Sequence, residues 1–144
     1  MEPRQPKVYF GHPINVYNTK LESRLIAAIK KTFPGWDIEN PGEKRHGEAC
    51  RRWGEKTGNV MDYFYKEVLP DCQAGVFLPF RDGKWGAGIF GEAKYLAENK
   101  CSIWQIDTKG HITRILLDEL AALTLSIEKT RKRIRNKDGS RKPY

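Results

Sequence analysis

The sequence predicts an α/β fold: a Rossmann-like, doubly wound parallel sheet in a single domain with helices on both faces. Segments with the composition of strands alternate along the chain with segments of helical periodicity, which is typical of a parallel sheet covered by helices. One strand segment, residues 74–80, is a nearly continuous apolar run, as expected for a strand buried on both faces. Ligands of such folds bind outside the carboxyl ends of the strands.

The first half of the chain contains two expected strands and one clear helix. Residues 7–11 form the first strand, and a helix follows that Asn18 or Thr19 can cap and that Pro34-Gly35 ends. Residues 36–40 alternate as a short strand. Residues 41–58 are rich in charge, glycine and histidine, and we expect a long loop, with at most a short helix around residues 48–53, acting as a lid or specificity loop.

The second half continues the alternation. We expect a helix over 59–69, the buried strand over 74–80, a helix over 89–100, a strand over 102–107, a short strand or extended link over 111–115, and a long helix over 116–127. A glycine-rich loop separates the buried strand from the next helix. Its glycines allow backbone N–H groups to approach a small polar or anionic ligand.

The charge of the chain is concentrated at its end. The formal net charge is +8, and residues 129–144 hold eight Lys or Arg and one Asp, which leaves only +1 on residues 1–128. We therefore divide the chain into an α/β domain over 1–128 and a basic tail over 129–144. Solubilisation is the favoured role of this tail, and contact with RNA or another anionic partner is the alternative.

Three cysteines without a CxxC pair argue against a disulfide framework or a zinc site, and no metal or organic cofactor is expected. The sequence contains no apolar segment of membrane-spanning length and no secretory signal, so we expect a soluble, cytoplasmic protein.

Three short motifs carry a family resemblance. They are Tyr9-Phe-Gly-His-Pro13 on the first strand, Asp62 and Asp71 at the two ends of the helix expected over 59–69, and Gly88-Ile-Phe-Gly-Glu92 after the buried strand. Together they resemble the nucleoside 2-deoxyribosyltransferase family and its relatives that hydrolyse the N-glycosidic bond of nucleoside 5′-monophosphates. The resemblance covers about residues 7–106.

The resemblance implies roles for individual residues. Glu92 would be the nucleophile, Tyr9 would hold its rotamer, and the subunits would pair as homodimers to complete their sites. Gly11, His12 and Asn15 would line the sugar pocket. Beside these roles, Trp85 and Phe90 could stack on the base or could equally be core or dimer-contact residues, and the backbone N–H groups of Gly86 and Gly88 could hold a phosphate.

The chain departs from the family where an Asp-Ser-Gly run is usual, because Gly86-Ala87-Gly88 stands there. The usual acid is therefore absent, and either Asp82 or Asp62 could replace it. Each assignment also has a structural alternative: Glu92 and Asp62 could stabilise helix ends, Tyr9 could be a core residue, and His12 could belong to a turn. The predicted function is N-glycosidic cleavage or transfer, and a non-catalytic nucleotide sensor of the same fold is the alternative.

Overall fold

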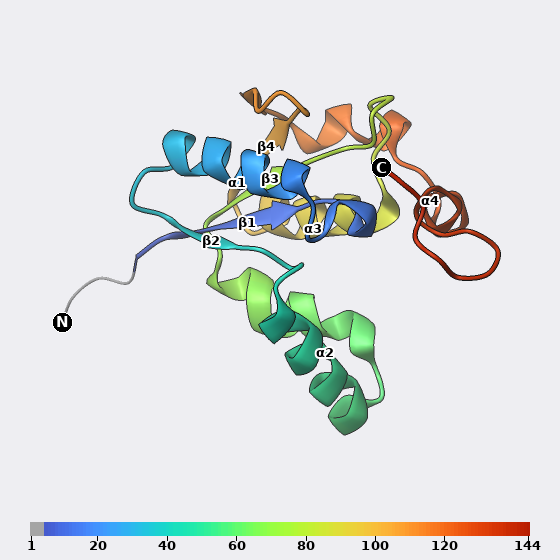
Figure 1. Ribbon diagram of the computed structural model, residues 1–144. Helices are drawn as coiled ribbons and strands as arrows, with labels where there is room; N and C mark the ends of the chain where they lie inside the picture. Colours follow the sequence, from blue (N-terminus) through green and yellow to red (C-terminus); the bar gives the residue numbers. More distant parts are fainter. Residues whose placement is uncertain (1–4) are drawn as a thin grey trace.

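Five strands form one mixed sheet in the computed structural model, which describes residues 5–144 (Figure 1). The strand order is β2-β1-β3-β4-β5. The first four strands are parallel and β5 runs antiparallel to β4. The strands are β1 (Lys7–Gly11), β2 (Asp37–Glu39), β3 (Ala74–Phe77), β4 (Ser102–Ile106) and β5 (Ile112–Arg114). The predicted α/β class with a mostly parallel sheet is confirmed.

The strands divide their side chains between two apolar clusters. Val8 and Phe10 join one cluster with Leu25 and Ile29 of helix α1 (Lys20–Thr32). Tyr9, between them in sequence, joins the other cluster with residues of helix α3 (Ala87–Glu98), because successive side chains of a strand point to opposite faces. All four residues of β3 are buried, as the apolar run predicts.

The helix start predicted after the first strand is confirmed. The side chain of Thr19 accepts a hydrogen bond from the backbone N–H of Glu22, which satisfies a donor that the helix leaves free. Helix α3 begins at Ala87, two residues before the predicted start. Glu92 therefore lies on the second turn rather than the first, and the helix dipole has little effect on it.

The loop predicted over 41–58 is wrong. Helix α2 (Lys44–Thr57) occupies it and ends at Gly58, whose positive φ of 76° suits a left-handed cap. The helix contains no Val, Leu or Ile, so it lacks a stripe of aliphatic residues. Instead it packs through Ala49, Cys50 and Trp53 and buries His46.

The helix predicted over 59–69 is broken into three short turns: 3-10 turns at Val60–Asp62 and Leu69–Asp71, with a π-helical turn at Phe64–Val68 between them. Pro70 lacks the N–H that a continued helix would need.

The helix predicted over 116–127 is also wrong. Two 3-10 turns, Leu117–Glu119 and Ala121–Leu123, replace it. The backbone of Trp85 donates to Leu123 O and accepts from Leu125 N, both at 2.8 Å, which holds this segment extended. The last helix, α4 (Ile127–Ile134), starts after Ser126, whose hydroxyl accepts from Lys129 N, and so it lies in the basic tail.

Within residues 5–144, no helix combines the length and apolar character needed to cross a membrane.

Candidate functional site

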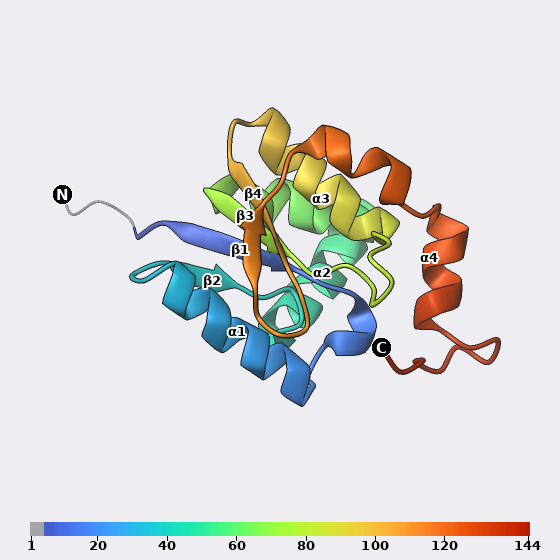
Figure 2. The ribbon, with the colours of Figure 1, turned by 90° about the horizontal axis from the view of Figure 1, so that it is seen from above.

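A cavity of about 540 Å³ lies at the carboxyl ends of β1 and β3. Strand β1 has β2 as its neighbour on one edge and β3 as its neighbour on the other. The strand order therefore reverses next to β1, and the cavity lies at this point. The loop after β1, the start of α3 and helix α4 surround it, and Figure 2 shows α4 beyond the end of β1. Its lining residues are His12, Pro13, Ile14, Tyr17, Tyr65, Phe80, Gly86, Ala87, Gly88, Ile89, Glu92, Ile127, Thr130, Arg131, Ile134 and Arg135.

Glu92 and Tyr9 meet at the base of this site. Tyr9 is only 1% exposed, and its hydroxyl donates a hydrogen bond to Oε2 of Glu92. The structure thus brings together two residues that are 83 positions apart in the sequence. No other residue of the described chain hydrogen-bonds the second carboxylate oxygen, Oε1, which leaves that oxygen available to a ligand.

The pKa values of both Glu92 and Tyr9 are raised. Burial raises the pKa of Glu92 to about 7, although the hydrogen bond from Tyr9 opposes the rise. Burial and the adjacent carboxylate raise the pKa of Tyr9 well above its usual value. Tyr9 therefore remains a hydrogen-bond donor, while Glu92 exchanges its proton near neutral pH. Perturbed carboxyl groups of this kind in a cavity are characteristic of functional sites.

Two further tyrosines line the cavity near Glu92. Burial raises the pKa of Tyr65 to about 12, and the charge of Glu92 contributes. Burial also raises the pKa of Tyr17, again with a contribution from Glu92. A Cβ on Gly91 would collide with the Tyr65 hydroxyl, so this glycine lets the π-helical turn approach α3 closely. Sequence reasoning missed both tyrosines.

His12 lines the cavity but has no free ring nitrogen. Nδ1 lies 2.9 Å from the carbonyl oxygen of Phe10, which can only accept, and Nε2 lies 2.8 Å from Oε2 of Glu22. Burial opposes ionisation of Glu22, yet the hydrogen bond and charge of His12 outweigh it and lower the pKa of Glu22. The imidazole thus fixes the loop and leaves no ring nitrogen for a ligand.

Gly11 and Asn15 shape the site without lining it. A Cβ on Gly11 would collide with the ring of Phe77. Asn15 is 5% exposed and donates from Nδ2 to Arg133 O at 3.4 Å, which ties the loop after β1 to helix α4. The two residues, predicted to line the sugar pocket, are therefore not part of the cavity wall.

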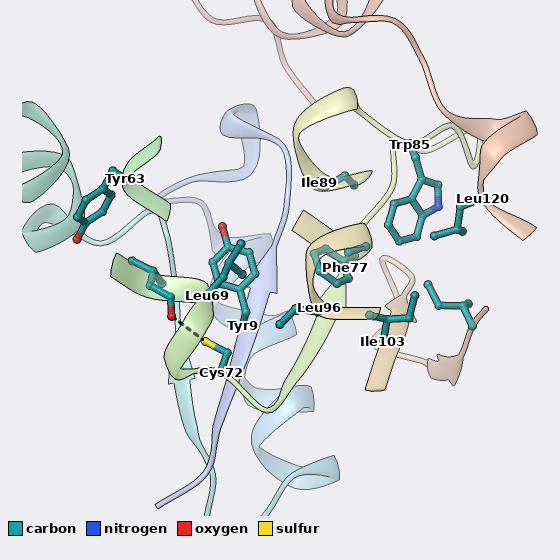
Figure 3. Close-up of a cluster of buried hydrophobic side chains, with 13 residues drawn as sticks. Tyr9, Tyr63, Leu69, Cys72, Phe77, Trp85, Ile89, Leu96, Ile103 and Leu120 are labelled. Atoms are coloured by element: carbon teal, nitrogen blue, oxygen red, sulfur yellow. Dashed lines mark hydrogen bonds between the residues drawn. The ribbon is translucent and has the colours of Figure 1, made fainter. Parts of the chain in front are cut away.

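The two aromatic residues predicted to stack on a base do not reach the cavity. Trp85 is fully buried beside Phe77 and Leu120 (Figure 3), and its Nε1 donates to Gln105 Oε1 at 3.2 Å. Phe90 packs against the same apolar cluster. The aromatic residues that do line the cavity are Tyr17, Tyr65 and Phe80.

The two candidate acids also lie elsewhere. Asp82 forms a bidentate pair with Arg133, at 2.8 and 2.7 Å, and these hydrogen bonds lower its pKa to about 2. Asp62 sits in the turn Val60–Asp62 and does not line the cavity. Among the residues that the structure describes, Glu92 is the single carboxylic acid in the cavity wall.

Gly86 and Gly88 do line the cavity, at the start of α3. Gly86 supplies no side-chain cap to this helix, and Ala87 N donates to Thr130 Oγ1 of α4 at 2.9 Å. The first turn of α3 therefore directs backbone N–H groups toward the same space as α4.

Helix α4 and the residue that follows it contribute five lining residues that sequence reasoning missed: Ile127, Thr130, Arg131, Ile134 and Arg135. Within the described chain, neither Arg131 nor Arg135 has a carboxylate partner, whereas Lys132 pairs with Glu128 and Arg133 with Asp82. The sequence did contain a signal for this helix: Ser126 can cap its start, and two isoleucines follow seven residues apart.

The segment after α4 folds back onto the body of the domain. Tyr144 donates from its hydroxyl to Pro79 O at 2.5 Å, and Arg81 Nε donates to Tyr144 O at 3.1 Å. Arg141 donates to Tyr17 O at 3.2 Å. These contacts hold α4 over the cavity.

A second polar cluster lies under α2. His46, 3% exposed, places Nε2 at 2.9 Å from Glu39 Oε2 and Nδ1 at 3.0 Å from the Tyr63 hydroxyl. The hydrogen bond from His46 lowers the pKa of Glu39 to about 2 against the effect of burial, and Arg45 adds to the lowering. Both ring nitrogens of His46 are hydrogen-bonded within the protein, so this cluster fastens α2 to β2.

Comparisons of the chain with protein-family models, curated proteins and solved structures give no match. In the described residues, no group of three or more His, Cys, Asp or Glu side chains is arranged to hold a metal ion.

Proposed function

We propose that the protein cleaves or transfers the N-glycosidic bond of a nucleoside or nucleoside 5′-monophosphate, with Glu92 as the nucleophile. The observation that carries this proposal is the Glu92 carboxyl group, held by Tyr9 in a cavity at the carboxyl ends of β1 and β3. A positioned carboxylate is what attack on an anomeric carbon requires.

In the proposed reaction, Oε1 of Glu92 attacks the anomeric carbon from the face opposite the base and forms a glycosyl-enzyme. Tyr9 holds Oε2, which fixes the rotamer of the carboxylate. Water or a second base then displaces Glu92 from the sugar.

A 5′-phosphate fits the opposite wall of the cavity. Arg131 on α4 and Arg135, the residue just after it, lack carboxylate partners among the described residues, and Thr130 and the start of α3 line the same cavity. Guanidinium groups and helix N-terminal N–H groups both favour phosphate. These features support a nucleotide over a nucleoside.

We also propose that the fold is Rossmann-like and doubly wound, with helices on both faces of the sheet. The two apolar clusters, one with α1 and one with α3, support this class. We further propose a homodimer, as the family resemblance implies, and a cytoplasmic location, as the sequence predicts.

A nucleotide sensor that binds without cleaving is the second candidate. It is favoured by one observation: neither Asp82 nor Asp62 brings a second carboxyl group into the cavity.

The test is chromatographic detection of free base after incubation with ribo- and deoxyribonucleosides and their monophosphates, with and without an acceptor base. We expect release or exchange by the native protein and at least a 100-fold loss in Glu92→Ala. Glu98→Ala is the matched control, because Glu98 is exposed on the same helix. Binding without release from any substrate would favour the sensor.

A further inference from the structure

We propose that the base released by this protein is one that is positively charged while it is attached to the sugar, as a pyridinium or an N7-alkylated purine is. This inference rests on the proposed function and names the substrate class of the same site. Such a base departs as a neutral molecule and needs no proton.

The argument starts from the acids in the cavity. A neutral nucleobase leaves with an extra electron pair on its ring nitrogen, so its departure requires a proton from a general acid. In the described part of the chain, the cavity wall contains one carboxyl group, Glu92, and the proposed reaction uses it as the nucleophile. Asp82 is paired with Arg133 outside the wall.

The remaining polar side chains of the wall are poor acids. A guanidinium group, as in Arg131 and Arg135, does not serve as a general acid in proteins. The hydroxyl groups of Tyr17 and Tyr65 are held in their neutral form by burial and by the charge of Glu92. His12 has both ring nitrogens engaged by Phe10 and Glu22.

The same wall is suited to a planar cation. Tyr17 and Tyr65 line the cavity, and the electron-rich faces of aromatic rings attract cations. Glu92 supplies a negative charge close to Tyr17 and Tyr65. The arginines that would repel a cation lie on α4 and directly after it, where we place the phosphate.

The step balances without an acid. Oε1 of Glu92 forms a bond to the anomeric carbon while the carbon–nitrogen bond breaks, and its electron pair neutralises the cationic ring nitrogen. Water then attacks the anomeric carbon and the bond to Glu92 breaks, which restores the carboxylate. The proton lost by water passes to the solvent.

A matched pair of substrates tests the inference: 7-methylguanosine 5′-monophosphate and guanosine 5′-monophosphate, which differ in one methyl group and one positive charge. Nicotinamide riboside 5′-phosphate is a second cationic substrate. Because the reactivity of these substrates differs without enzyme, each rate is divided by its uncatalysed rate. We expect kcat/KM for both cationic substrates to exceed that for guanosine monophosphate by at least 100-fold. After division by the uncatalysed rate, the value for the cationic substrates should be no lower than the value for guanosine monophosphate.

The pH profile provides a second readout. The titratable or charged groups around Glu92 are Tyr9 from β1 and, in the cavity wall, His12, Tyr17, Tyr65, Arg131 and Arg135. Because both ring nitrogens of His12 are engaged and the tyrosine hydroxyls are held neutral, we expect kcat/KM for nicotinamide riboside phosphate to rise once as Glu92 ionises and then to stay level. A fall at higher pH would reveal an essential acid and would overturn the inference.

The outcomes separate the two proposals. Comparable cleavage of guanosine monophosphate would overturn the cationic-base inference and leave the proposed function intact. No release from any substrate would overturn the proposed function, and the inference with it. Release that persists in Glu92→Gln would overturn the role of Glu92 in both.

Discussion

Glu92 is placed where its charged form is poorly solvated, because the carboxyl group is buried and is bound by the single hydroxyl of Tyr9. Its pKa of about 7 exceeds the usual value of 4.5. At pH values between 4.5 and about 7, the folded protein therefore keeps a proton on Glu92 that the unfolded chain has released. The free energy of unfolding should fall as pH rises through this window.

Glu92→Gln tests how much stability the protein loses when the buried Glu92 carboxyl group ionises. The amide keeps a hydrogen-bond acceptor for Tyr9 but carries no charge. At about pH 8 we expect the variant to be more stable than the native protein by roughly 1–3 kcal/mol, and near pH 5 the gain should largely disappear. Urea denaturation at both pH values measures the difference. Glu98→Gln, on the exposed side of α3, should show no such dependence, and an equal gain at both pH values in Glu92→Gln would contradict the explanation.

Residue by residue, the sequence motifs found the Tyr9 and Glu92 pair and the glycines at the start of α3. They misplaced the aromatic residues, because a motif does not determine which side of a loop faces a cavity. Trp85 turns toward Gln105 and the core, whereas Tyr65 reaches the cavity only through a π-helical turn that no periodicity indicates.

Among the elements, α4 changes the interpretation of the site most. Its basic residues look like a solvated tail in the sequence, yet Thr130 caps the start of α3 and Arg131 and Arg135 line the cavity. Counting charges along the sequence cannot reveal that α4 lines the cavity. The docking of α4 depends on long-range contacts such as the pair of Asp82 with Arg133, which are 51 residues apart.

Arg131→Gln and Lys132→Gln compare two adjacent residues of α4. Arg131 lines the cavity, whereas Lys132 is exposed and pairs with Glu128 at 3.5 Å. We expect Arg131→Gln to raise KM for a nucleoside monophosphate about 10-fold, the loss of one charge-assisted contact, and to leave KM for the matching nucleoside unchanged. Lys132→Gln should alter neither. Steady-state kinetics on the two substrates would contradict the phosphate assignment if both variants behaved alike.

Helix α2 shows a different limit of the sequence pattern. It has no stripe of large aliphatic residues, and it is held by His46, which bridges Glu39 and Tyr63. Polar fastening of this kind depends on partners on β2 and in the turns that follow, so local periodicity does not predict it.

In the molecule as a whole, the alternation of strand and helix segments is a local property, and it predicts the α/β class correctly. The closure of the cavity is a long-range property. Tyr144 reaches Pro79, and Arg141 reaches Tyr17, 124 residues away in the sequence. The expected division at residue 128 separates a basic tail from the domain, whereas residues 127–135 supply one wall of the site and the residues after them tie back to the domain.

Removal of residues 127–144 distinguishes these two views. As a wall of the site, the segment is needed for catalysis, so we expect the truncated protein to keep its α/β circular dichroism, lose about 1–3 kcal/mol of stability and lose at least 10-fold in kcat/KM. Asp82→Asn, which weakens docking of α4 without deleting it, should give a smaller loss in the same direction. As a solubilising or RNA-binding tail, the segment would be dispensable: full activity in both variants, with loss of salt-dependent RNA binding alone in the truncated protein, would show that residues 127–144 act apart from the cavity.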